Sequence, residues 1–85
     1  MNAHQVENAA AVLECLAAGN DPDRTLLLCA ALTLDTLCGV KPDRDLLDAS
    51  AGLRVLVRGG SLDLNSAGRE RAQKLAEAVR VHIPG

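Results

Sequence analysis

The stretch PDRTLLLCAALTLDTLC, residues 22–38, is an almost continuous run of aliphatic and small side chains. Asp21, Pro22 and Asp23 suit a helix start, where free amides accept a carboxylate cap and proline loses no hydrogen bond. Leu and Ala are strong helix formers, so the run predicts a helix from about Pro22 to Cys38. Its apolar residues cover nearly every direction around the axis. Such a helix is either the central core helix or an interface between two subunits.

A chain of 85 residues forms one domain and has few other elements to cover this helix. Leaving one apolar face in water costs several kcal/mol at roughly 25 cal/mol per Å², out of a total stability of about 5–15 kcal/mol. We therefore expect self-association as a homodimer, with Leu26, Leu28 and Leu32 at the interface. The alternative is a monomer that covers every face internally.

The apolar content is aliphatic: 15 Leu, 14 Ala, 7 Val and 1 Ile, with no Phe, Tyr or Trp. This composition favours helices, because strands are enriched in β-branched and aromatic residues. It also counts against binding of single-stranded nucleic acid, which uses aromatic rings to stack bases. Protein interfaces without Trp or Tyr must rely on Arg and packed Leu.

Three further helices are predicted, one before this apolar run and two after it. The first runs from Asn2 to Ala18 and ends at Gly19; its apolar stripe is Val6, Ala9, Ala10, Leu13 and Leu16. A short helix runs from Asp43 to Ala51 and ends at Gly52. The last runs from Ser66 to about Val81 after a capping Asn65; its stripe is Ala72, Leu75, Ala76, Val79 and Ile83.

Between the last two helices the hydrophobic pattern alternates. Residues 53–57 (LRVLV) and 61–64 (SLDL) flank Arg58-Gly59-Gly60, and a Gly-Gly pair between such runs is typical of a β-hairpin turn. The expected fold is mainly α with one β-hairpin, a single domain over residues 1–85. Its order is helix, helix, short helix, hairpin, helix.

Residues 53–72 resemble the wing and following helix of winged-helix domains, in which a hairpin leads into a pattern like Leu-Thr-x-x-Gly-Arg. Here LNSAGR at residues 64–69 matches with Asn in place of Thr. The resemblance implies a wing tip at residues 58–61 and a recognition helix from Asp43 to Ala51. That helix carries Asp43, Asp45 and Asp48, which would repel phosphates, and the pI is about 5.5. The resemblance therefore favours protein binding, with a DNA-binding transcriptional regulator as the alternative.

No catalytic or metal motif is recognised in the sequence. His4 and His82 lie near the chain ends, and Cys15, Cys29 and Cys38 form no C-x-x-C pair. We expect reduced, mostly buried thiols, no enzyme activity, no metal and no cofactor. The chain shows neither a secretory leader nor a membrane span, so we expect a cytoplasmic protein with no membrane partner.

The charges are divided unevenly, with −5 over residues 1–51 and +3 over residues 52–85. This asymmetry is typical of a basic surface for a partner, or else of a solvated mixture of charges. We expect a partner-binding surface formed by Arg54, Leu56, Arg58, Arg69 and Arg71. The sequence thus predicts a small regulatory or adaptor protein, of a kind common in bacteria and phages, whose partner is another protein.

Overall fold

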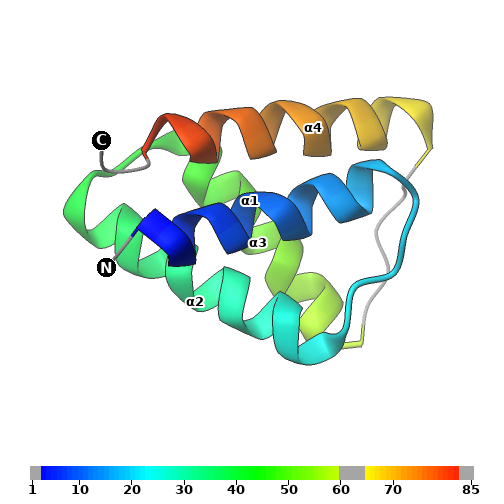
Figure 1. Ribbon diagram of the computed structural model, residues 1–85, viewed down its shortest axis with the longest axis horizontal. Helices are drawn as coiled ribbons and strands as arrows, with labels where there is room; N and C mark the ends of the chain where they lie inside the picture. The colour runs from blue at the N-terminus through cyan, green and yellow to red at the C-terminus, as the bar shows by residue number, and fades with distance from the viewer. Residues whose placement is uncertain (1–2, 60–64, 83–85) are drawn as a thin grey trace.

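The computed structural model describes residues 3–59 and 65–82, which form four helices (Figure 1). These are α1 (Ala3–Ala17), α2 (Arg24–Val40), α3 (Arg44–Val57) and α4 (Ser66–Val81). Over this part of the chain there is no strand. In the same residues, no helix combines the length and the apolar character needed to cross a bilayer.

Helix α1 lies at the centre of the arrangement. It packs against α4 on one side and α2 on the other, while α3 packs mainly against α2 behind it (Figure 1). Six α1 side chains are buried, more than in any other described helix: Val6, Ala9, Ala10, Val12, Leu13 and Leu16. The predicted stripe of the first helix is confirmed, because all five of its members are among them.

Alanine is the most frequent residue of the core, and its small side chain lets helix backbones approach closely. Ala10 and Ala76 are completely buried, and the largest enclosed side chains include Leu34, Leu46 and Leu53. In α4, Ala72, Ala76 and Val79 of the predicted stripe are buried and Leu75 packs against the core, whereas Ile83 lies outside the described residues. A core without aromatic rings therefore depends on close contact between small and branched side chains.

The predicted fold with a β-hairpin is wrong. Residues 53–57, expected as its first strand, are the last turns of α3, and Gly52 lies within that helix instead of ending it. The physical reason is burial: Leu46, Ala49 and Leu53 repeat at helical spacing and are all covered in the core. The expected second strand, residues 61–64, lies outside the described residues. Without the first strand, the winged-helix architecture does not apply.

Residues next to the helices in the sequence determine where α3 and α4 begin and where α3 ends. Asp43 caps α3 by accepting from the Asp45 amide at 2.8 Å, and Asn65 caps α4, as predicted, by accepting from the Gly68 amide at 2.9 Å. Gly59, expected in a hairpin turn, follows the last residues of α3 with a φ of +85°. That left-handed conformation ends helices and strongly favours glycine.

Replacing Gly59 with alanine should therefore destabilise the protein by about 1 kcal/mol, because an L side chain is strained at positive φ. Gly39 is the matched control: it lies inside α2 and an added Cβ there meets no atom within 4 Å. Gly39→Ala should stabilise the fold by up to about 1 kcal/mol through helix propensity. Urea unfolding of both variants measures the difference, and equal effects of the same sign would contradict this account of the α3 terminus.

Candidate interaction surface

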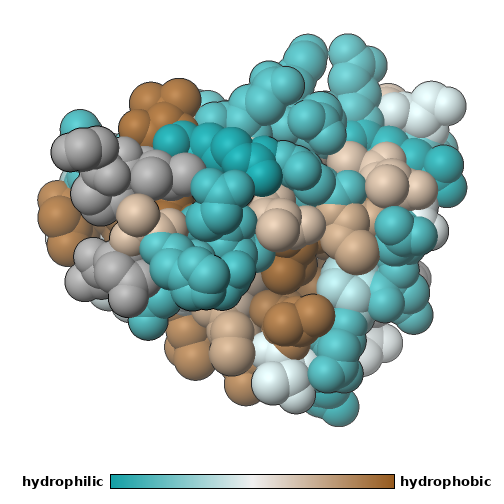
Figure 2. All heavy atoms as spheres, in the orientation of Figure 1, coloured by the Kyte–Doolittle hydropathy of each residue, from teal (hydrophilic) through white to brown (hydrophobic). Residues whose placement is uncertain are grey.

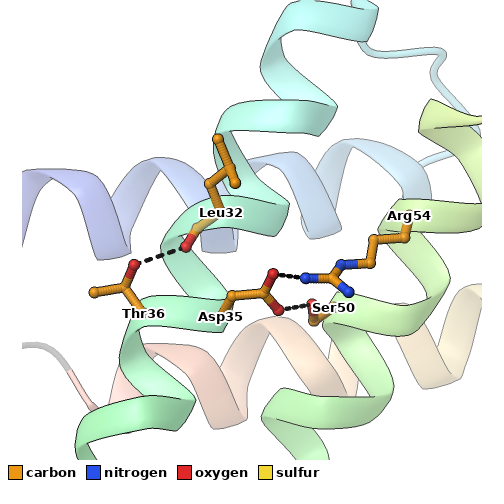
Figure 3. A network of polar contacts seen from close by, with 5 residues as sticks. All are labelled: Leu32, Asp35, Thr36, Ser50 and Arg54. Atoms are coloured by element: carbon orange, nitrogen blue, oxygen red, sulfur yellow. Dashed lines mark hydrogen bonds and ion pairs between the residues drawn. The ribbon is translucent and has the colours of Figure 1, made fainter.

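The predicted partner-binding surface begins with Arg54, which the structure ties to its own molecule. Asp35 of α2 reaches toward α3 and accepts hydrogen bonds from the Ser50 hydroxyl and the Arg54 guanidinium (Figure 3). Ser50 is the buried polar residue of the described core, and Asp35 satisfies it. This network holds α2 against α3, so Arg54 is not a free cation.

The other predicted partner-binding residues differ in their surroundings. Arg71 pairs with Asp48 at 2.6 Å, and Leu56 is half-buried against the core. Arg69 lies over the turn after α1, where a Cβ added to Gly19 would meet its Nη2 at 3.0 Å. Arg58 makes no ion pair with any other described residue. Of the five residues, Arg54 and Arg58 line one hollow, while Arg54 and Arg71 are already paired with carboxylates.

Several basic residues of the second half of the chain pair with carboxylates of the first half. Arg80 of α4 pairs with Glu7, at 3.2 Å, and with Glu14, both on α1. His82 Nε2 lies 3.4 Å from Asp43 Oδ2, which joins the end of α4 to the start of α3. Together with the pairs of Arg54 and Arg71, these contacts connect the basic second half of the chain to the acidic first half. The excess positive charge is thus mostly used within the fold.

One face of α2 has a different character, and we call it the α2 outer face. It consists of seven residues that are all exposed and all uncharged: Thr25, Leu28, Cys29, Leu32, Thr36, Gly39 and Val40. The Thr36 hydroxyl donates to the Leu32 carbonyl at 3.0 Å, so its polar group is already satisfied within the helix (Figure 3). Solvent-facing helix surfaces are ordinarily rich in charge, and this one carries none.

The three leucines predicted at a dimer interface are all exposed, but they do not all line the same depression of the surface. Leu26 lines a groove between α1 and α2, while Leu28 lines a hollow between α2 and α3. Leu32 borders both and is 57% exposed. The hollow, of about 150 Å³, also includes Arg54 and Arg58. The structure thus brings part of each predicted site together beside Leu32.

The groove between α1 and α2 has a volume of about 710 Å³ and is lined entirely by uncharged side chains. Small and aliphatic residues from both helices form it, including Ala9, Val12, Leu26 and Ala30. Figure 2 shows apolar atoms gathered along the line between α1 and α2 and continuing over α2. Groove and α2 outer face together make an extended uncharged region on this side of the molecule.

The cysteines are unpaired and differ in their surroundings. Cys29 is exposed, which corrects the expectation of core packing for that thiol, whereas Cys15 and Cys38 are partly covered. Burial, together with the nearby Asp43 carboxylate, raises the pKa of Cys38 above its ordinary value. Within residues 3–59 and 65–82, no three His, Cys, Asp or Glu side chains are grouped so that they could hold a metal ion.

Most of the α2 outer face was missed by sequence reasoning, which named only Leu28 and Leu32 of its seven residues. The signal was present: Arg24 and Asp35 are the only charged residues of α2, and on a helical wheel both fall on the side of α3. A helix that keeps its charges on one side leaves the rest of its circumference uncharged. Identifying that strip as exposed required the packing of α1 and α3.

Comparison with known proteins gave no match to a family model, to a curated protein or to a solved structure.

The Asp35 network makes a prediction about stability. Asp35→Ala leaves the buried Ser50 hydroxyl without its partner and should cost about 1–3 kcal/mol. Arg54→Ala removes an ion pair whose arginine is 52% exposed, so it should cost at most about 1 kcal/mol. Urea unfolding of the two variants measures both values. A loss at Arg54 equal to or larger than the loss at Asp35 would show that the hydroxyl contact contributes nothing.

Proposed function

We propose that this protein is a non-enzymatic regulatory or adaptor protein that acts by binding another protein through the α2 outer face. The observation that carries the proposal is a strip of seven exposed residues along a 17-residue helix, none of them charged. Contiguous exposed apolar patches on small proteins mark interaction sites more often than chance would give. The cytoplasm is the proposed compartment, because an odd number of unpaired thiols persists in a reducing environment.

Energetics support a binding role for this face. Leu28 is 45% exposed and Leu32 57%. Fully burying one leucine contributes about 1.5–3 kcal/mol, so completing the burial of each contributes roughly 1 kcal/mol. The hydroxyl of Thr36 needs no new partner when water leaves. Covering this face therefore removes apolar surface from water without stranding a buried charge.

Protein is favoured over duplex DNA as the partner. Of the five residues predicted to contact a partner, Arg54 and Arg71 are already paired with carboxylates. The α2 outer face offers no cation for phosphates, which dominate the affinity of DNA-binding proteins. The hairpin that would have served as a wing is replaced, in its first half, by the last turns of α3.

Site-specific photo-crosslinking in the native host tests the proposal. A photoreactive residue at position 32 should yield a covalent adduct with a protein, whereas the same residue at position 55 should yield little. Val55 is the matched control because it is an exposed aliphatic residue of α3, 40% exposed, outside the α2 outer face. Adducts of equal yield at both positions, or none at position 32, would refute a binding role for this face.

A further inference from the structure

The hollow between α2 and α3, which we call the α2–α3 hollow, combines apolar walls with positive charge. Its walls are small or aliphatic side chains: Leu28, Ala31, Leu32 and Val57. Leu28 and Leu32 also belong to the α2 outer face, so the hollow is the border of that face toward α3. Unlike the rest of the face, this border has charged side chains beside it, and they bear on what can bind there.

The described lining of the hollow carries more positive than negative charge. Arg54 and Arg58 contribute two cations, and Asp35 contributes the one carboxylate. Asp35 already accepts hydrogen bonds from the Ser50 hydroxyl and the Arg54 guanidinium. Arg58 is exposed and makes no ion pair with another described residue. The hollow therefore presents one unpaired cation next to aliphatic walls.

A second unpaired arginine extends this charge along the same seam. Arg24 is the first residue of α2 and precedes Leu28 by four positions, so the two side chains lie on one side of the helix, one turn apart. The start of α2 lies beside the end of α3 (Figure 1), since Leu28 and Val57 line the same hollow. Neither Arg24 nor its neighbour Asp23 forms an ion pair with another described residue. Two unpaired arginines thus lie at this end of the seam.

The size of the hollow suits one side chain of a larger partner. Sites for small molecules usually enclose about 300–1,000 Å³, at least twice the volume of about 150 Å³ found here. A single aliphatic side chain in a pocket is a common anchor of protein interfaces. Its neighbours in the partner must then tolerate two arginines, which favours carboxylates over cations. Phosphates of a nucleic acid would match the arginines but would bring no aliphatic group to the walls.

We propose that the α2–α3 hollow binds an acidic, aliphatic segment of the partner protein. One aliphatic side chain lies between Leu28 and Val57, and adjacent carboxylates lie at Arg24 and Arg58. This inference rests on the proposed function and states the chemistry of the partner. The aliphatic side chain removes the walls from water. The carboxylates meet exposed cations at the rim, where charge affects selectivity and association rate more than affinity.

Short synthetic peptides test the charge preference, with NMR chemical shifts of the protein as the measurement. At millimolar concentration, acetyl-Glu-Leu-Leu-Glu-amide should shift the amide signals of Leu28, Val57 and Arg58. Acetyl-Lys-Leu-Leu-Lys-amide has the same length and the same leucines, and it should bind at least about fivefold more weakly because its charges are repelled. Equal affinity for the two peptides, or no shift at these positions with the acidic one, would overturn the proposal.

A third peptide tests the part played by the aliphatic walls. Acetyl-Glu-Ser-Ser-Glu-amide keeps both carboxylates but has no apolar side chain to place between Leu28 and Val57. It should bind more weakly than the acidic leucine peptide, because it leaves the walls in water. Equal binding of the two acidic peptides would identify a site for anions in general, phosphates included, and would overturn the proposal.

Substitution of the arginines tests which cations act. Arg58→Gln should weaken the acidic leucine peptide roughly two- to fivefold, whereas Arg58→Lys keeps the charge and should retain most of the affinity. Arg44 is the matched control, because it is an exposed arginine without a described ion pair at the other end of α3. Arg44→Gln should leave binding unchanged. Equal losses at positions 44 and 58 would contradict the proposed contact.

Charge reversal separates this inference from the proposed function. In the double variant Arg24→Glu/Arg58→Glu, with folding checked by circular dichroism, the adduct formed from a photoreactive residue at position 32 should fall several-fold. The yield in Arg44→Glu should stay unchanged. An adduct of full yield in the folded double variant would overturn the inference and leave the proposed function intact. The absence of any adduct at position 32 in the chain with its natural arginines would refute the proposed function itself.

Discussion

The close packing of α1 against two helices at once is the contact on which the arrangement depends. Ala9 and Ala10 are almost completely covered, and their small side chains let α2 and α4 approach α1 from two sides. Bulkier residues at these two positions would hold the helices apart and leave voids that a core of this size could not tolerate. With α1 enclosed, α2 takes an outer position, and its far side has no helix of this chain to cover it.

The polar contacts determine which side of α2 remains apolar. Asp35 binds Ser50 and Arg54 across the seam with α3, so the carboxylate in the interior of the α2 sequence is drawn away from the solvent face. Ion pairs from α4 to α1 and α3 similarly match the basic and acidic halves of the chain. The same network that holds the helices together thus leaves the α2 outer face without charge, and this is the surface through which we propose that a partner binds.

The sequence predicted the first and last helices well because their apolar stripes have a single helical period and clear caps, as at Asn65. It failed at residues 53–57, whose apolar positions fit both an alternating strand and the continuation of a helical stripe from Leu46. Burial of Leu53 decided between them, and burial is a property of the whole fold. For α2, the sequence indicated that some face needs cover. Which face stays exposed depends on where α1 and α3 pack, which no local pattern contains.

The most direct test is methyl NMR with a soluble paramagnetic probe, comparing Leu28 and Leu32 of the α2 outer face with the enclosed Leu34 of the same helix. We expect strong relaxation of the Leu28 and Leu32 methyl groups in the protein alone, and protection of both when the protein captured through position 32 is added. Leu32 methyls that are as protected as those of Leu34 in the protein alone, or that stay unprotected with the captured protein, would contradict a binding role for this face.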